Sequence, residues 1–315
     1  MHLFRFFFLC VFIDRKDFFC VLIAQMPRLY ESYQVVGTVT PELSQALGLP
    51  NTVKVVAGAG DNAAAAVGTG VVGSGGCNIS LGTSGTIFIS SKEFGVDPHN
   101  ALHAFAHADG GWHLMGCMLS AASCNKWLCD DILKTTDYEA EQKDITPDKL
   151  GNNHVYFLPY LMGERSPIND TNARGTFIGM TMDTSRSDLV QAVLEGVAFA
   201  IRDSFEVATS LGISIPKTKI CGGGSKSPLW RTIFANVLGI PLELLKTEQG
   251  PGYGGAILAM VGCGQYESVQ AAVDNLVEVA AVVEPDAELT KRYEARYQQF
   301  RKLYPALKDT FAQLL

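Results

Sequence analysis

Charge of either sign is scarce in this sequence. Asp, Glu, Lys and Arg make up 18% of the 315 residues, against about 25% in an average soluble domain. The net charge is −7 and the basic residues form no stripe, so a nucleic-acid partner is not expected. The apolar run Leu3–Ile13 contains Arg5. It is too short for a membrane span of about 20 residues, so no membrane partner is expected either.

Cysteine pairs at metal-ligand spacing are also missing. None of the eight cysteines forms a C-x-x-C motif, so neither a zinc site nor a disulfide framework is indicated. We predict free, mostly buried thiols in a reducing cytoplasm. His99, His103 and His107 are four residues apart, but no helix-start signal or acidic cluster accompanies them. We interpret them as ordinary polar or core histidines and expect no metal ion held by protein ligands alone.

Residues 1–25 differ from the rest of the chain. Their first apolar run ends at the charged residues 14–17, and no A-x-A cleavage site follows. Two interpretations remain open: a targeting segment with a weak basic start, or an atypical apolar leader that does not belong to the fold. We favour the second, read from an upstream start or a disrupted gene, because the sequence after it follows a regular pattern.

That pattern alternates strands and helices, and 47% apolar residues are enough to bury a core. Val53–Ala57 is predicted to be a buried strand, and two apolar runs around residues 81–85 predict a β-hairpin. An apolar stripe at helical spacing, with Ser187 as its cap, predicts a helix over Ser187–Leu211. Such repeated units indicate an α/β fold. The other predicted elements are strands 112–115, 155–158 and 217–221 and helices 63–67, 118–133, 227–238, 253–262 and 286–307.

Three glycine-bearing segments carry candidate chemistry. In Gly58–Asp61 a strand ends in glycines and a helix opens, so that a carboxylate could accept a proton from a hydroxyl; Asp61 could equally be a helix cap. The turn Gly82–Gly85 could gather backbone N–H groups around a phosphate, or be an ordinary hairpin turn. In Gly222–Ser227, glycines before a helix allow a flat ligand or an anion to approach. Neither a Rossmann nor a Walker A motif occurs, so a nucleotide here implies another fold.

In their order, these segments resemble the FGGY carbohydrate kinases, whose superfamily includes actin and chaperone ATPases. Residues 175–195 are similar to the second signature of that family, and the likeness runs from about Pro27 to about Leu307. The resemblance implies an α/β, actin-like ATPase (ribonuclease H-like) fold, here the C-terminal domain plus a remnant of the first domain. Residues 112–122, 157–161 and 163–167 are most similar to members that phosphorylate the 5-hydroxyl of D-xylulose.

The resemblance also implies roles for the three segments. It implies ATP and Mg²⁺ as cofactors, a small-molecule sugar as substrate and Asp61 as the catalytic base, with Mg²⁺ bridging phosphate oxygens through waters. The residues implied to bind ATP are Gly82, Thr83, Ser84 and Gly85 at the phosphates and Gly222, Gly223, Gly224 and Ser227 at the adenosine.

Part of the family pattern is missing, because no Asp-x-Gly-Thr loop occurs. We therefore expect residues 26–74 to be the end of an N-terminal domain carrying Asp61, and 75–310 to be the C-terminal ATP-binding domain. The expected partners are a missing N-terminal domain or a second copy of the chain. The expected function is a D-xylulose kinase, impaired in this chain; the alternatives are an inactive nucleotide-binding fragment or an FGGY kinase for another sugar or polyol. An unpaired edge at strand 53–57 predicts self-association.

Overall fold

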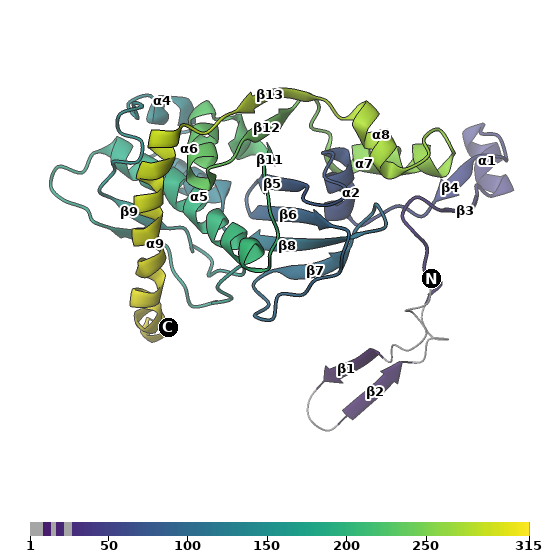
Figure 1. The fold of residues 1–315 in the computed structure, drawn as a ribbon, viewed down its shortest axis with the longest axis horizontal. Coiled ribbons are helices and arrows are strands. Elements are labelled where there is room, and N and C mark those ends of the chain that lie inside the picture. Colours follow the sequence, from purple (N-terminus) through teal and green to yellow (C-terminus); the bar gives the residue numbers. More distant parts are fainter. Residues whose placement is uncertain (1–8, 14–16, 22–26, 315) are drawn as a thin grey trace.

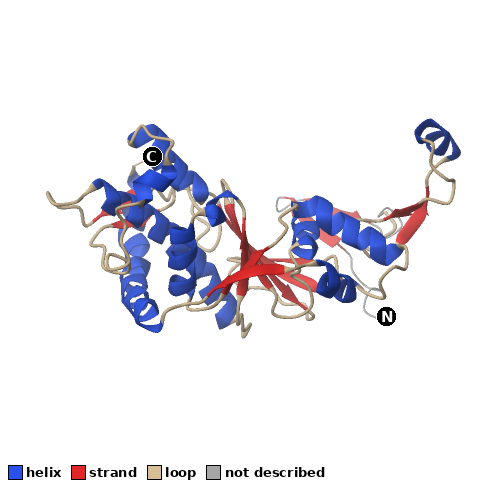
Figure 2. Cartoon of the chain, turned by 90° about the horizontal axis from the view of Figure 1, so that it is seen from above, coloured by secondary structure: helices blue, strands red, loops and turns tan. Residues whose placement is uncertain are grey.

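The structure, a computed structural model, describes residues 9–13, 17–21 and 27–314, with side chains from residue 27 onward. The predicted leader thus lies largely outside the described residues. Within it, β1 (Leu9–Ile13) and β2 (Asp17–Val21) form an antiparallel pair. The rest of the fold centres on a seven-stranded sheet with helices on both of its faces, seen edge-on in Figure 2.

The central sheet has the strand order β13-β12-β11-β5-β6-β8-β7 (Figure 1). Strand β11 is parallel to both β5 and β12, whereas the other neighbouring pairs are antiparallel. The β5–β6 pair confirms the predicted hairpin. The strands are β5 (Cys77–Leu81), β6 (Gly85–Ser91), β7 (His103–Ala106), β8 (Trp112–Met118), β11 (Thr218–Cys221), β12 (Leu242–Leu245) and β13 (Val279–Val283).

Alternating side chains of β6 show how the sheet separates two cores. Ile87 and Ile89 point to the larger core, while Phe88 points to the opposite face and packs with Ala66 and Val71, as the two-residue period of a strand requires. The larger core is covered by α5 (Arg186–Ser210), α6 (Pro228–Leu238) and α9 (Ala287–Gln313). The opposite face carries α2 (Asp61–Gly68), α7 (Gly250–Gly262) and α8 (Val269–Leu276).

Shorter elements lie around this framework. A small sheet beyond α7, with α1 between its strands, forms one end of the molecule in Figure 2. The shorter elements are β3 (Val35–Thr38), α1 (Pro41–Leu47), β4 (Lys54–Val56), α3 (Ala122–Lys126), a π-helix (Trp127–Ile132), α4 (Tyr138–Gln142), β9 (Tyr156–Leu158), β10 (Thr176–Ile178) and a 3-10 turn (Gly223–Lys226).

Three local predictions were wrong. Strand 53–57 exists as β4, but it is exposed rather than buried, because β3 is its one partner strand in the described chain and the central sheet lies elsewhere. The predicted helix 118–133 begins at Ala122, since Met118 continues β8. The cap of α5 is Ser185, which forms a reciprocal capping box with Asp188, whereas the predicted cap Ser187 lies inside the first turn.

The predicted thiols and histidines take ordinary places in the fold. The described cysteine side chains are free, and three of the six are buried. His107 is buried beside Phe88, and its Nε2 donates to the Val71 carbonyl (2.9 Å). Burial lowers the pKa of His107 and favours the neutral ring, although the charge of Asp109 and the hydrogen bond to Val71 act in the opposite direction.

Candidate functional site

Two glycine turns meet at one edge of the central sheet. Adjacent parallel strands β5 and β11 are in register at Ser80 and Cys221, so both end at the same edge. The hairpin turn (Gly82–Gly85) follows β5, and the glycine loop (Gly222–Ser225) follows β11. A Cβ atom on Gly222 would lie 2.8 Å from the Leu81 carbonyl oxygen. The two predicted ligand loops are therefore direct neighbours in space.

Among the residues described, the hairpin turn leaves two of its N–H groups unpaired, while its Gly82 N–H donates to the Ser84 carbonyl (3.1 Å). Its inner carbonyls, of Gly82 and Thr83, accept hydrogen bonds from the segment that joins β8 to α3. In the described part of the chain the N–H groups of Thr83 and Ser84 donate to no acceptor, and both residues are exposed. Two neighbouring unpaired N–H groups are suited to bind an anion such as a phosphate.

The glycine loop leaves room for a ligand at one position. Gly222 has a φ of +92°, which favours glycine, and Gly224 is buried against Leu81 and Trp230. Gly223, in contrast, is exposed, and a Cβ atom there would have open space around it. A flat ligand can thus approach the backbone at Gly223, next to the hairpin turn.

Ser227 already has two partners. Its hydroxyl accepts from the Trp230 N–H (3.1 Å), which caps α6, and donates to Gln142 Oε1 (2.6 Å). The other three residues predicted at the adenosine are glycines. The Ser227 hydroxyl is the one side-chain group among the four, and it is hydrogen-bonded within the protein. Gln142 is the last residue of α4.

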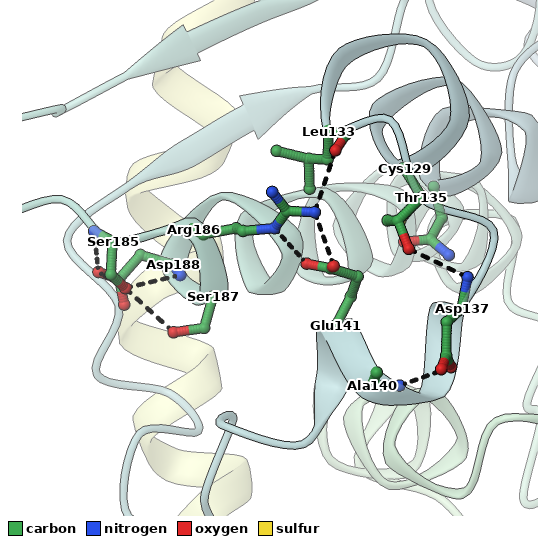
Figure 3. Close-up of polar contacts among 11 residues, drawn as sticks. Cys129, Leu133, Thr135, Asp137, Ala140, Glu141, Ser185, Arg186, Ser187 and Asp188 are labelled. Atoms are coloured by element: carbon green, nitrogen blue, oxygen red, sulfur yellow. Dashed lines mark hydrogen bonds and ion pairs between the residues drawn. The ribbon is translucent and has the colours of Figure 1, made fainter.

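An ion pair joins α4 to the start of α5, as Figure 3 shows. Arg186, at the start of α5, donates through Nε and Nη2 to both carboxylate oxygens of Glu141 (2.6 and 2.7 Å) and to the Leu133 carbonyl (3.1 Å). The Arg186 side chain is about half exposed, so the energy of this pair is modest. Its effect is positional, since it fixes the helix that presents Gln142 to Ser227.

Asp61 is the first residue of α2, and Gly60 occupies the cap position without a side-chain hydrogen bond. The Asp61 carboxylate is exposed and accepts from the neighbouring Asn62 N–H (2.8 Å). It makes no hydrogen bond with either glycine segment in the described residues. Asp61 is thus free to meet a ligand in solvent, although it also satisfies one N–H of the first turn.

Helix α2 is fixed relative to the sheet. It packs closely on α7, where a Cβ atom on Gly254 would lie 1.7 Å from the Ala64 carbonyl oxygen. After the helix, Lys219 Nζ of β11 donates to the Gly70 carbonyl (2.8 Å). The strand that leads into the glycine loop therefore also holds the helix that carries Asp61.

One buried carboxyl beneath the hairpin turn had not been predicted to have a role. Glu164 is 2% exposed, and burial raises its pKa to about 7, although hydrogen bonds from the N–H groups of Leu119 and Arg165 act in the opposite direction. Sequence analysis used residues 163–167 only for their resemblance to a kinase family. No spacing rule links Glu164 to a turn about 80 residues earlier in the chain.

Two further features bear on cofactors and location. No group of three or more potential metal-ligating side chains occurs among the described residues. Among the same residues, no helix combines the length and the apolar character that a membrane crossing requires.

Comparison with known proteins gives the class and then the family. Solved sugar kinases share the fold, which is that of the actin-like ATPases. The chain belongs to the FGGY family of carbohydrate kinases, because the family's C-terminal domain matches residues 77–263 and its N-terminal domain matches residues 16–68. The second match begins within the predicted leader.

Among curated relatives, the chain is similar to the xylulose kinase of Escherichia coli strain K12, with 39% identity over 289 residues, and to that of Bacillus subtilis strain 168, with 31% over 284. Each alignment covers 90% of this chain but only 58% and 57% of the relative. The chain thus spans little more than half the length of these relatives.

A solved "xyloylose kinase" from Brucella ovis superposes with a TM-score of 0.85 and 38% identity, over 91% of this chain and 59% of that one. A xylulose kinase structure from Rhodospirillum rubrum superposes with a TM-score of 0.81 and 28% identity, over 93% of this chain and 59% of that one.

Proposed function

We propose that this chain carries the nucleotide side and the catalytic base of a kinase that transfers the terminal phosphate of ATP to the 5-hydroxyl of D-xylulose. The observation that carries the proposal is the pair of glycine turns at one sheet edge, with the N–H groups of Thr83 and Ser84 unpaired among the described residues. The xylulose kinases that the chain resembles support D-xylulose as the acceptor.

We place ATP across the two turns. Its phosphates meet the hairpin turn (Gly82–Gly85), and its adenosine lies along the glycine loop where Gly223 is open. Ser227 then acts by capping α6 and fixing the end of that loop. Unpaired N–H groups fixed before the reaction stabilise the charge that develops on the transferred phosphoryl group.

Asp61 is proposed to orient the sugar hydroxyl and accept its proton. An exposed carboxylate at the start of α2 is accessible to a ligand in solvent, and general-base catalysis by such a group contributes about 10²–10⁴-fold in rate. Mg²⁺, when bound with ATP, neutralises phosphate charge. Because the described residues offer no cluster of three metal ligands, the phosphate oxygens and waters would supply most of its coordination.

The domain and partner assignments belong to the same proposal. We place the end of the N-terminal domain at residues 26–74 and the ATP-binding domain at 75–310, although the packing of α2 on α7 crosses that boundary. The chain would act in the cytoplasm, together with a companion N-terminal segment or as a homodimer.

The test is D-xylulose-dependent release of ADP from MgATP by the full chain, with ATP affinity measured by calorimetry. The isosteric Asp61→Asn change is expected to lower turnover by at least about 100-fold and to leave ATP affinity within about twofold, because Asp61 does not contact the glycine turns. Equal turnover in both proteins would overturn the assignment of Asp61.

The same experiment separates the alternative functions. ATP binding without D-xylulose-dependent ADP release would indicate a nucleotide-binding fragment. Faster release with glycerol, gluconate or ribulose than with D-xylulose would indicate a kinase for another sugar or polyol. Absence of ATP binding would reject both the kinase and the fragment.

A further inference from the structure

Glu164 contacts the segment Leu119–Ser123, which links β8 to α3 and includes the first two residues of that helix. This segment, here called the β8–α3 connection, is hydrogen-bonded to the back of the hairpin turn. We propose that Glu164 is a positioning residue for phosphate binding: its carboxyl fixes the connection, and the connection holds the Thr83 and Ser84 N–H groups outward. This inference rests on the proposed function, because it assigns the hairpin turn to the phosphates of ATP.

The first step is the contact between Glu164 and the connection. Glu164 Oε1 accepts from the N–H of Leu119 (2.9 Å), the first residue after β8, and from its own neighbour Arg165 (2.7 Å). The loop that carries Glu164 is itself fixed. Its backbone exchanges two hydrogen bonds with Asp170 (2.8 and 2.9 Å), and the Ser166 N–H donates to the Cys117 carbonyl of β8 (2.9 Å).

The second step leads from the connection to the hairpin turn. The Ala121 N–H donates to the Thr83 carbonyl and the Ala122 N–H to the Gly82 carbonyl, both at 2.9 Å. The Ser123 hydroxyl (2.7 Å) and the Ser123 N–H (3.4 Å) also donate to the Thr83 carbonyl. With both inner carbonyls occupied in this way, the peptide planes of the turn are set, and the N–H groups of Thr83 and Ser84 face solvent.

The third step is the cost of placing a carboxyl here. The other oxygen of Glu164, Oε2, is buried and has no partner in the described chain. Burying a carboxyl with one oxygen unpaired is unfavourable, whereas an apolar side chain of similar size would not carry that cost. What the glutamate supplies in return is the acceptor for Leu119, so the proposed role depends on an acceptor oxygen and not on negative charge.

That distinction defines the variants. Glu164→Met keeps the volume but removes the acceptor, whereas Glu164→Gln keeps an acceptor oxygen at the same place. Ser120→Ala is the matched control, since the Ser120 hydroxyl is equally buried, lies in the same connection and has no partner among the described residues. Should Glu164→Met fail to fold, Glu164→Asp withdraws the acceptor by one methylene group.

Each full-length variant is tested for two properties: affinity for MgATP and for adenosine by calorimetry, and amide hydrogen exchange of residues 119–123. With Glu164→Met we expect at least tenfold weaker ATP binding, adenosine affinity within twofold, and at least tenfold faster exchange at Ala121 and Ala122. Glu164→Gln and Ser120→Ala should stay within twofold of the unchanged chain in every measurement.

Equal losses for ATP and adenosine with Glu164→Met would overturn the proposal in favour of a general structural role. So would unchanged exchange at Ala121 and Ala122. If the unchanged chain binds neither ligand, the proposed function fails, whereas the exchange measurement still decides whether Glu164 holds the hairpin turn.

Discussion

Two neighbouring glycines of the glycine loop have opposite surroundings. Gly222 has a φ of +92° and lies against the Leu81 carbonyl, whereas Gly223 has open space where a side chain would begin. The first glycine is required by the fold, and the second leaves room for a ligand. Substitution by alanine should therefore separate stability from binding.

We expect Gly222→Ala to lower the free energy of unfolding by about 2 kcal/mol or more, because it adds backbone strain and a contact with Leu81. Gly223→Ala should change it by less than about 0.5 kcal/mol but weaken ATP binding. Urea unfolding and calorimetry check the two effects. Normal ATP binding by Gly223→Ala would contradict the placement of adenosine at this glycine.

Glu164 should make stability depend on pH. Its pKa is about 7 in the folded chain, against an ordinary value of 4.5, so the folded state holds the proton more tightly than the unfolded state does. The stability that this proton contributes is present below pH 4.5 and is lost as the pH rises through 7. The loss amounts to at most roughly 3 kcal/mol.

Urea unfolding at pH 5 and pH 8 tests this linkage with Glu164→Gln, which cannot ionise. The stability of the variant relative to the unchanged chain should increase from pH 5 to pH 8. Burial raises the pKa of Asp203 to about 6, so it titrates in the same range, and only the difference between the two proteins isolates Glu164. A difference that is constant with pH would contradict the prediction.

At the scale of elements, the packing of α2 on α7 leaves no room for a side chain at Gly254. At Gly255, one residue further along α7, a Cβ atom would have open space around it. Gly254→Ala should destabilise the chain by about 1–3 kcal/mol, whereas Gly255→Ala should stabilise it by about 0.5–1 kcal/mol because alanine favours a helix. Thermal unfolding of the pair checks this, and equal melting temperatures would contradict it.

Helices and strands were predictable to different degrees. Helix α5 was recognised along nearly its whole length, because its apolar stripe repeats at helical spacing. Its residues 190–201 are nevertheless buried on every side, which a one-sided stripe does not predict. Strand β4 was located correctly, but its burial was not, because a short β-branched run cannot tell which sheet a strand joins. Strands β12 and β13 were missed, since their short runs carry no turn signal like that of the β5–β6 hairpin.

At the scale of the whole molecule, the small β3–β4 sheet has exposed strands and no third strand in the described chain. Val56 packs near Gly262 of α7, whereas Val55 is 41% exposed. Free edges with apolar side chains favour pairing between chains. We expect the full chain to self-associate in light scattering at micromolar concentration, and Val55→Lys to reduce this. A monodisperse monomer of the unchanged chain would contradict the prediction.

The sequence by itself determined the α/β pattern, the hairpin, the long helix and the resemblance to a kinase family, because these depend on local spacing and on short motifs. Only the tertiary structure decided that the hairpin turn and the glycine loop are neighbours, since strands β5 and β11 are about 140 residues apart in sequence. It likewise decided that Glu164 lies behind the hairpin turn. Burial and hydrogen bonds between distant segments arise only when the sheet assembles, and no local pattern encodes them.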